Sequence, residues 1–566
     1  MKRNIISKAV LILFATSIVV GCGESKKKTM DQDLTDFIKT FEGKYIPLFK
    51  ESNIAYFDAT TTGKDEFFKK SEDAQNKIVT ILSNKDDFKK LKEFKESGKI
   101  ENDTLKRQLE VLYNMFLSNQ VEPSKLNAII ALETQVEKKY STFRADVQGV
   151  AKELTDNQIE EVLRTSNNSK ELEATWIASK QVGKMIEPDI RKLVKMRNEI
   201  ARELGYKNYH EMSLKLGEQD PAEIEKLFDE LDNLTRDSFV KLKNEIDANL
   251  TARYKVKKEE LRPWHYQNRF FQEAPKIYQV DLDKYYKGKD LVEITTRYFK
   301  SIGLPIEDMV KKSDLFEKPG KNQHAYCTDI DNEGDVRVLC NVKDNSYWMN
   351  TMLHEFGHAV YDKNIDRKLP FILRDPAHTF TTEAIAMIFG RMSNNAQWMQ
   401  DLLGINEQEA KKIAEESYKV LRLEQLVFSR WSQVMYRFEK LMYENPDQDL
   451  NKLWWDLVEK YQLLTRPENR NEPDWASKIH IATSPCYYHN YLMGELLASQ
   501  LHNYITVNII KSEDSRGQSF YNKADVGKYL TEKIFSPGSL FTWNAMIEKA
   551  TGEKLTAKYY AKQFVD

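Results

Sequence analysis

Two histidines four residues apart, with a glutamate directly after the first, have the types and spacing needed for metal chemistry. His354, Glu355 and His358 stand in the segment TMLHEFGHAV of this 566-residue chain. On an α-helix such residues share one face, so both imidazoles can reach one metal ion while the glutamate takes a proton from water. The alternative is a solvent-facing helix with two surface histidines, and the pattern alone does not decide.

A catalytic zinc ion needs a third protein ligand and one open coordination position. The segment HTFTTEAIAMIFGRM supplies Glu383, 25 residues after His358, in an otherwise apolar helical run. An unpaired carboxylate would be costly to bury there, so a metal ion explains it, with a salt bridge to an arginine as the alternative. We therefore predict His354, His358 and Glu383 as ligands of one zinc ion. Glu355 is the predicted general base, which passes its proton to the leaving amine.

The elements that must position these residues are predicted to be a hairpin followed by a helix. The segment QHAYCTDIDNEGDVRVLCNV (323–342) has two extended runs around a DNEG turn. Asn345 or Ser346 then caps a helix that carries the two histidines. Apolar residues recur on one face of this helix: Met349, Leu353, Phe356 and Val360.

The chain is predicted to be helical from about residue 30 onward, with few glycines (21) and prolines (15). A typical apolar stripe consists of Ile190, Leu193, Met196, Ile200 and Leu204. Gly205 ends that helix and Asn208 begins the next. No repeat or long linker divides the chain, so residues 31–566 are expected to form one helical domain.

The composition is that of a globular protein, with 41% hydrophobic and 30% charged residues. Lys and Arg number 85 against 87 Asp and Glu. Because the charges balance, nucleic acid is not an expected partner.

The N-terminus has the pattern of an export signal. The basic start MKRN and the apolar run AVLILFATSIVV (9–20) are followed by Gly21 and Cys22. This run is shorter than the roughly 20 residues of a membrane span. Its end resembles a bacterial lipobox, in which Cys22 is lipidated; the alternative is a secretory signal with a chance cysteine. We expect residues 1–21 to be the signal, 22–30 a lipid anchor and tether, and the protein an exported lipoprotein of the cell envelope, periplasmic or associated with the outer membrane.

Three further cysteines follow the expected export signal. An oxidising compartment permits disulfides. Cys327 and Cys340 flank the predicted hairpin, so we predict that they are bonded and that Cys486 is free.

Downstream motifs carry a family resemblance. The segment WWDLVEKYQLLTRPENRNEPDWASKIHIATSPCYYHNYLMGELL (454–497), with QHAY and HEFGH, resembles the angiotensin-converting-enzyme family of zinc dipeptidyl carboxypeptidases over residues 320–500. Two earlier segments, RNEIARELGYKNYHEM (197–212) and LRPWHY (261–266), resemble oligoendopeptidases of the thimet-oligopeptidase type. The resemblance implies a mainly α, two-lobed, helix-rich gluzincin peptidase with a deep central cleft and a small hairpin beside the zinc helix.

The resemblance also implies roles for residues outside the metal motif. His480 and Tyr491 would stabilise the oxyanion, a task for hydrogen-bond donors in a water-poor cleft. His324 and the backbone of Ala325 would hold the peptide as an added strand.

Lys478 and Tyr488 would bind the terminal carboxylate of the peptide, which restricts cleavage to positions near the C-terminus. The alternatives are that Lys478 is a solvated surface charge and that Tyr488 and Tyr491 are core aromatics.

The chain departs from the family pattern at several positions. Asn490 and Val458 stand where the family has chloride-binding arginines, so we expect little activation by chloride. Met387 replaces the family's acidic residue four positions after the third ligand, so another group must orient the ligating histidines. One extra residue between His480 and Tyr491, and the spacing to Glu383, fit the oligopeptidase relatives slightly better.

The sequence therefore predicts a monomeric, lipid-anchored zinc peptidase that acts on short peptides and releases C-terminal dipeptides. An endo-acting oligopeptidase with the same metal site is the alternative within enzymes. A catalytically dead, peptide-binding lipoprotein is the alternative from another class. The presence of Glu355, His480 and Tyr491 argues against it, because a binding protein needs no general base.

Overall fold

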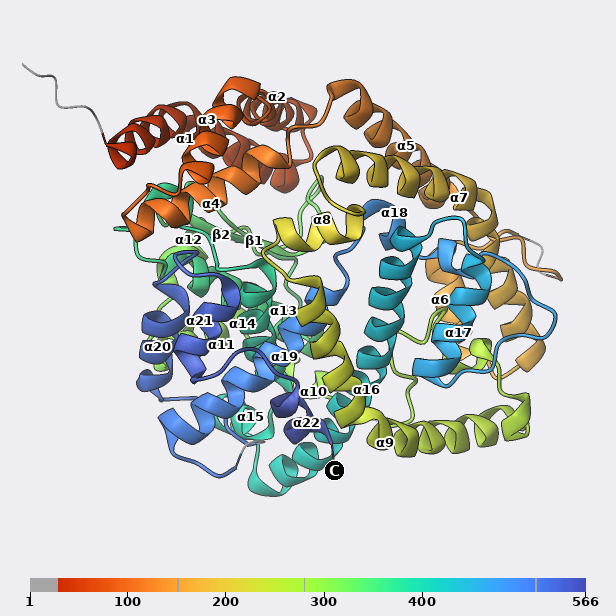
Figure 1. The fold of residues 1–566 in the computed structure, drawn as a ribbon. Coiled ribbons are helices and arrows are strands. Elements are labelled where there is room, and N and C mark those ends of the chain that lie inside the picture. The colour runs from red at the N-terminus through yellow and green to blue at the C-terminus, as the bar shows by residue number, and fades with distance from the viewer. Residues whose placement is uncertain (1–28, 150–151, 279, 515–516, 566) are drawn as a thin grey trace, which may run out of the picture.

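The computed structural model describes residues 29–149, 152–278, 280–514 and 517–565. The structure is 69% helical, and its described residues form one small antiparallel sheet, so the mainly α prediction is confirmed (Figure 1). The predicted signal peptide and Cys22 lie outside the described residues. None of the described helices has both the length and the apolar character needed to cross a membrane.

The first four helices pack together at one edge of the molecule, in red and orange in Figure 1. Their bounds are Met30–Thr62 (α1), Asp65–Leu82 (α2), Lys85–Ser97 (α3) and Asp103–Leu117 (α4). They have an apolar core of their own, which also takes in Ile372 and Leu373 from a short helix near the predicted metal site. The N-terminal helices are therefore anchored to the segment between the second and third predicted ligands.

The next part of the chain contains two long helices, α7 and α9, and three shorter ones. Their bounds are Pro123–Thr142 (α5), Asp156–Thr165 (α6), Ser169–Glu203 (α7), Tyr209–Leu216 (α8) and Pro221–Tyr254 (α9). Helix α7 contains most of the predicted apolar stripe and ends just before Gly205. The Asn208 side chain accepts a hydrogen bond from the backbone N–H of Glu211 and caps α8, as predicted.

Shorter elements lead from α9 to the predicted hairpin. They are Lys258–Glu260 (η1), Pro263–Tyr266 (η2), Asp283–Tyr286 (α10), Leu291–Ser301 (α11) and Glu307–Lys312 (α12). The hairpin consists of β1 (Tyr326–Asp329) and β2 (Val336–Leu339), which pair antiparallel, as predicted.

The hairpin leads into the two helices that carry the predicted ligands. These are α13 (Ser346–Lys363) and α14 (Thr379–Gly390), with the short η3 (Phe371–Leu373) between them. Helices α13, α14 and the later α19 (His489–Tyr504) pack together in the interior (Figure 1). This central layer holds the predicted site.

The remaining elements complete the C-terminal half. They are Arg391–Asn394 (η4), Ala396–Leu403 (α15), Glu407–Glu444 (α16), Leu450–Gln462 (α17), Asp474–Ser477 (η5), His480–Thr483 (α18), Ile505–Ile510 (η6), Ala524–Leu530 (α20), Thr531–Phe535 (η7), Trp543–Thr551 (α21) and Lys558–Phe564 (α22). One apolar core runs from α5 to α22 and includes the buried faces of α13, α14 and α19.

Helices α13 and α14 approach each other most closely at Gly357, inside the H-E-F-G-H motif. A Cβ atom at this position would lie 2.8 Å from the Cα atom of Ala386. Real Cβ atoms do not approach backbone atoms so closely, so only glycine allows the two backbones to pack here.

The predicted disulfide between Cys327 and Cys340 is not formed. Among the described residues, Cys327, Cys340 and Cys486 are all free thiols. The hairpin register places Val338 opposite Cys327. Cys340 is therefore a diagonal neighbour, and diagonal Cβ atoms in a strand pair lie farther apart than the roughly 3.5–4.5 Å of a disulfide.

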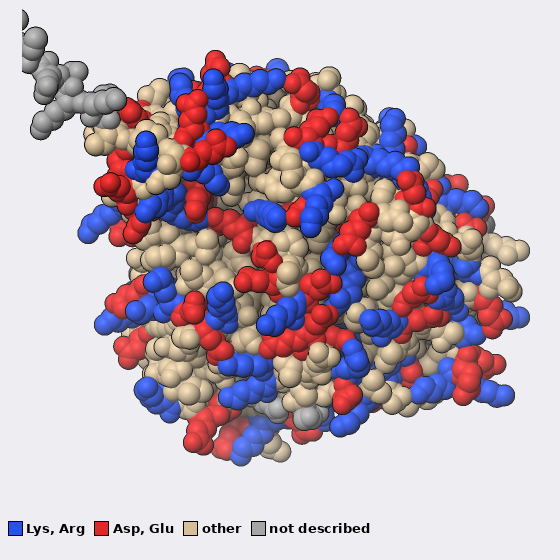
Figure 2. Space-filling model, viewed as in Figure 1, with Lys and Arg blue, Asp and Glu red and all other residues tan. Residues whose placement is uncertain are grey.

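Charged side chains of both signs are interspersed over the face seen in Figure 2. This distribution agrees with the balanced composition.

Candidate metal centre and active site

Helix α13 begins where the sequence predicts and turns its two histidines toward α14. The Asn345 side chain accepts a hydrogen bond from the backbone N–H of Trp348 at 2.9 Å and caps the helix. The predicted apolar face is fully buried: Met349, Leu353, Phe356 and Val360. Burial of that face fixes the rotation of the helix and so the direction of the histidines.

The three predicted ligands come together. His354 Nε2 lies 3.5 Å from Glu383 Oε1, and His358 Nε2 lies 3.5 Å from Glu383 Oε2. One ligand atom from each residue falls within 4.8 Å of the others, and this is the one such group found among the described residues. Ligand atoms held about 2.1 Å from a tetrahedral zinc ion are about 3.4 Å apart. The donor set and its spacing therefore fit zinc.

A residue that the sequence did not single out contacts the second histidine. Thr382 Oγ1 lies 2.8 Å from His358 Nδ1, the ring nitrogen that faces away from Glu383. Such a partner fixes the ring orientation and leaves the other nitrogen free for a metal. In the family, an acidic residue at the position of Met387 is expected to orient a ligating histidine, and methionine cannot do so. Here the hydroxyl of Thr382 is the hydrogen-bond partner of His358. The only feature of the sequence that could have indicated this role of Thr382 is its position directly before the third ligand, Glu383.

Burial and mutual charge shift the pKa values of this group. Burial lowers the pKa of His354 to about 4 and raises that of Glu355 to about 7. Burial would also lower the pKa of His358, but the hydrogen bond and charge of Glu383 outweigh it and raise that pKa. Burial would raise the pKa of Glu383, but His358 and His354 outweigh it and lower that pKa. A glutamate with a pKa near neutrality suits a group that takes up and releases a proton.

The metal-ligand group opens into a cavity of about 700 Å³. Helix α1, the β1 strand, α13 and the start of α14 line it. Glu355 also lines the cavity and is only 8% exposed. Because β1 pairs with β2 alone in a two-stranded sheet, the sheet leaves β1 one unpaired edge. Strand residues Tyr326–Asp329 line the cavity, so unpaired strand backbone is available beside it.

Three aspartates make part of the cavity wall acidic. Asp329, Asp362 and Asp375 line it, and Arg367 pairs with Asp329 at 3.1 Å. Burial, followed by the charge of Asp329, raises the pKa of Asp362 to about 7. Burial raises the pKa of Asp375 to about 6 despite a hydrogen bond from Asn332.

The two predicted peptide-binding residues of the hairpin differ in position. Ala325 lines the cavity beside the ligands. His324 is exposed, does not line the cavity, and its backbone N–H donates to Asn322 Oδ1 at 3.0 Å. In this structure only Ala325 is brought to the metal-ligand group.

Lys478 and Tyr488 are buried together, which excludes a solvated surface lysine. Lys478 is 7% exposed, and its Nζ atom lies 5.3 Å from the centre of the Tyr488 ring. It donates a hydrogen bond to Gln272 Oε1 at 2.5 Å. Burial lowers the pKa of Lys478 to about 8. Gln272 is a second residue that the sequence reasoning missed, although it lies close after the LRPWHY segment.

A row of aromatic rings connects Lys478 with the metal-ligand group. The His480 and Tyr488 rings are 5.4 Å apart, and the Tyr488 and Tyr491 rings 5.3 Å apart. Burial, and then the charge of Glu383, raises the pKa of Tyr491. Burial lowers the pKa of His480 to about 4, so its imidazole is neutral, and its Nδ1 atom has no hydrogen-bond partner among the described residues.

Hydrogen bonds from buried polar groups fix the segment that carries Lys478, His480 and Tyr488. Arg197 on α7 donates hydrogen bonds to the backbone carbonyls of Ile481, at 3.4 Å, and Ala482. Glu439 on α16 accepts the backbone N–H of Cys486 at 2.8 Å. The same segment packs on α7 at Gly183, where a Cβ atom would lie 2.5 Å from the carbonyl oxygen of Pro473. The loop is therefore fixed by the surrounding helices.

The two positions that depart from the family's chloride pattern are both buried. Asn490 Oδ1 accepts a hydrogen bond from Gln219 at 2.7 Å, and Val458 belongs to the apolar core. Neither residue offers a positive charge. The expectation of little chloride activation stays a prediction.

The fold and the site together define a class of protein. The protein is helical, two packed helices carry a His-His-Glu group, and a buried glutamate lies beside that group. Zinc peptidases have this arrangement. The sequence model of peptidase family M2, described as angiotensin-converting enzyme, matches residues 28–564. The chain belongs to this family of peptidases.

Individual relatives are distant. The angiotensin-converting enzyme of Theromyzon tessulatum is 26% identical over 50% of this chain and 47% of its own length. The angiotensin-converting enzyme-like protein Ace3 of Mus musculus is 23% identical over 70% of this chain and 57% of its own. Thermostable carboxypeptidase 1 of Pyrococcus furiosus is 22% identical over 40% of this chain and 49% of its own. The chain spans about half the length of these curated relatives.

Proposed function

We propose that this protein is a zinc peptidase that releases C-terminal dipeptides from short peptides. The observation that carries the proposal is the pairing of two features: the group of His354, His358 and Glu383, and the buried Lys478 separated from it by the tyrosines at 488 and 491. The first feature suits hydrolysis of an amide bond. The second suits binding of a carboxylate on the far side of these tyrosines.

The residues of the chain divide the chemistry among them. Zinc held by His354, His358 and Glu383 would supply a Lewis acid, which polarises a carbonyl and lowers the pKa of water. Glu355 accepts a proton from the attacking water and donates it to the leaving amine. Tyr491 and the neutral His480 donate hydrogen bonds to the oxygen that becomes negative during the reaction.

Substrate position is set at both ends of the site. The free edge of β1, together with the preceding residue Ala325, binds the peptide backbone as an added strand. At the other end, Lys478 donates a charge-assisted hydrogen bond to the terminal carboxylate, with Gln272 and Tyr488 around it. We expect a carboxylate bound at Lys478, beyond Tyr488 and Tyr491, to bring the second peptide bond from the C-terminus to the metal.

The test compares one short peptide with a free and with an amidated C-terminus. We expect rapid release of a dipeptide from the free form and at least tenfold slower cleavage of the amide. Equal rates and the same cleavage position would favour the endo-acting oligopeptidase. Metal analysis of the purified protein should give one zinc per chain, and absence of both zinc and hydrolysis would support a peptide-binding protein without activity.

We also propose that the protein is an exported lipoprotein that works as a monomer at the cell envelope. The basic and apolar N-terminal pattern ending at Cys22 supports this proposal. Labelling of growing bacteria with radioactive palmitate should mark the wild-type protein. The Cys22→Ala variant should remain unlabelled, and equal labelling of both would contradict the proposal.

A further inference from the structure

Asp362 lies on α13 four residues after the predicted ligand His358, which places both on one face of the helix. It lines the cavity at the metal-ligand group together with Asp329, the last residue of β1, and Asp375, in the loop before α14. The proposed hydrolysis uses none of these three carboxylates. Their contribution is the negative charge that they give to one part of the cavity, and we call this part the acidic wall.

The cations near the acidic wall neutralise only part of it. Arg367 donates hydrogen bonds to Asp329 Oδ2 at 3.1 Å and to two backbone carbonyls. Arg374 is the only lysine or arginine that lines the cavity in the described part of the chain, and its guanidinium pairs with a glutamate outside the cavity. Of the three aspartates, Asp329 alone therefore forms a salt bridge with a described lysine or arginine.

The surroundings of Asp362 lack a compensating positive charge. After burial, the charge of Asp329 does most to raise its pKa, and Asp375 acts in the same direction. His358 and Arg367 act to lower it, yet the pKa is still raised to about 7. Neighbouring carboxylates without enough positive charge are destabilised when they ionise. A ligand that brings a cation to this wall would relieve that repulsion.

A zinc ion at the ligands would not cancel the charge of the acidic wall. The ion would add positive charge to the cavity, and its own charge belongs in the balance. The carboxylates of Glu383 and Glu355 lie at that position and offset it. Asp362 and Asp375 would therefore still make this part of the cavity anionic.

The acidic wall and the proposed carboxylate site are separate parts of the molecule. Lys478 does not line this cavity, and the charges that act on it are those of Arg269, Glu273 and Glu160. None of these is among the charges that act on Asp362. A peptide with its terminal carboxylate at Lys478 and its cleaved bond at the metal-ligand group therefore has its N-terminal residues left to face the acidic wall.

We propose that the substrates are peptides with a basic side chain, lysine or arginine, on the N-terminal side of the cleaved bond. The cation of that side chain donates charge-assisted hydrogen bonds to Asp362 and Asp375. Complementary charge of this kind acts mainly on the choice of ligand. The inference rests on the proposed function, because it takes Lys478 as the site of the terminal carboxylate.

Calorimetric titration with acetylated pentapeptides tests this proposal. The peptides are Ala-X-X-Ala-Ala with a free C-terminus, in which X is lysine, norleucine or glutamate. The full-length, zinc-loaded Glu355→Gln protein is titrated, so that the peptides stay intact. We expect the lysine peptide to bind at least tenfold more tightly than the norleucine peptide, which has the same length without the charge, and the glutamate peptide to bind most weakly. Equal affinity for the lysine and norleucine peptides would overturn the proposal.

A second pair of peptides tests the position of the basic side chain. In Ala-Ala-Ala-X-X the two variable residues belong to the dipeptide that is released. Lysine should bind no more tightly than norleucine in this pair. A tenfold preference for lysine here as well would show that the cation is not read on the N-terminal side of the cleaved bond.

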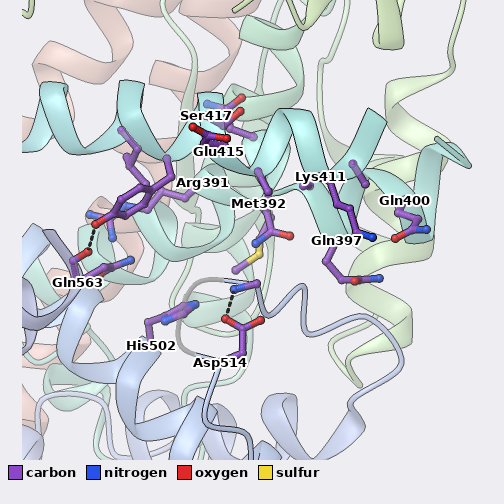
Figure 3. Close-up of a pocket in the computed structure, with 18 of the residues that line it drawn as sticks. Arg391, Met392, Gln397, Gln400, Lys411, Glu415, Ser417, His502, Asp514 and Gln563 are labelled. Carbon is purple, nitrogen blue, oxygen red and sulfur yellow. Dashed lines mark hydrogen bonds between the residues drawn. The ribbon is translucent and has the colours of Figure 1, made fainter. Parts of the chain in front are cut away.

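Variants of the acidic wall locate the contact. Asp362→Asn and Asp375→Asn, each added to the Glu355→Gln protein, keep the shape of the side chain and should weaken binding of the lysine peptide at least fivefold. Binding of the norleucine peptide should not change, which also shows that the protein is folded. Glu415→Gln is the control, since this glutamate pairs with Lys419 and lines a separate cavity of about 720 Å³ with no lining residue in common (Figure 3). If the lysine peptide keeps its advantage in both aspartate variants, the proposal is wrong.

Hydrolysis of the same peptides by the wild type separates this inference from the proposed function. Preferred binding of the lysine peptide that is lost in Asp362→Asn, without cleavage of any peptide, would support the acidic wall as a binding site and contradict the peptidase function. Cleavage of the lysine and norleucine peptides with equal kcat/KM would support the peptidase function and contradict the inference.

Discussion

The Nδ1 atom of His358 lies 2.8 Å from the hydroxyl oxygen of Thr382, the residue directly before the third predicted ligand. One turn of α14 therefore supplies both a ligand and the group that orients another ligand on α13. The predicted metal centre therefore depends on the packing of α13 against α14.

We predict that Thr382→Val lowers zinc affinity by about 10- to 100-fold, because the substitution keeps the shape of the side chain but removes the partner of the imidazole. Competition with a fluorescent zinc chelator measures this change. Thr351→Val is the control, since Thr351 is half-buried and its hydroxyl donates to the backbone carbonyl of Tyr347 within α13. An unchanged zinc affinity in Thr382→Val would show that this contact does not orient the ligand.

Glu355→Gln should reduce kcat/KM for a short peptide by at least about 10³-fold, because the amide cannot accept a proton. The zinc content should remain that of the wild type, since Glu355 is not a predicted ligand. Atomic absorption and steady-state kinetics measure the two quantities. Glu161→Gln, at an exposed position of α6, is the control. Unchanged peptide turnover in Glu355→Gln would contradict the proposed mechanism.

Tyr491→Phe should lower kcat by about 10²–10³-fold with little change in KM, because the hydroxyl is proposed to bond mainly to the oxygen that gains charge during the reaction. Steady-state kinetics on one peptide separates the two constants. Tyr347→Phe, at a residue that is 68% exposed, should change neither. A large rise in KM with kcat intact would instead assign Tyr491 to substrate binding.

Lys478→Met should raise KM for a peptide with a free C-terminus by about 10- to 100-fold, because a hydrogen bond to a charged group contributes about 1.5–3 kcal/mol. Methionine keeps an apolar stem in contact with the surrounding rings. Cleavage of the amidated peptide should change little, so the ratio of the two rates is the decisive measurement. Lys184→Met, on the exposed face of α7, is the control. If the ratio stays as in the wild type, Lys478 does not bind the carboxylate.

Glu439 should make the protein less stable as the pH rises. Burial raises its pKa from 4.5 to about 8, although the Cys486 N–H and Arg197 oppose the shift. The folded state therefore holds a proton that the unfolded state releases, and the stabilisation is complete below about pH 4.5 and is lost through pH 8. Urea unfolding from pH 5 to 8.5 should show wild type losing on the order of 4 kcal/mol relative to Glu439→Gln. Parallel curves for the two proteins would show that the pKa is not shifted.

The sequence was sufficient for the features that depend on local periodicity and on close spacing. The stripe in α7, the cap at Asn208, the hairpin and the start of α13 follow from turn chemistry and helical repeat. His354 and His358 lie on one face because a helix places them there. Glu383 was recognised as a carboxylate in an apolar run, and the structure brings it to the same point.

The remaining features depend on contacts between segments far apart in the chain. Gln272 and Lys478 are 206 residues apart, and no local pattern relates them. The disulfide prediction was wrong because flanking a hairpin does not make two residues opposite neighbours, and the register of Cys327 is set by its pairing with Val338.

The close approach at Gly357 has a consequence for how a metal would arrive. Close backbone packing at this point opposes sliding of α13 along α14, and the ligand atoms already lie within 4.8 Å of one another in the folded chain. The entropy of bringing three ligands together is then lost during folding and not during capture of the ion. A larger residue at position 357 would push α13 and α14 apart without removing any ligand. The three ligands would then have to be brought together each time an ion binds.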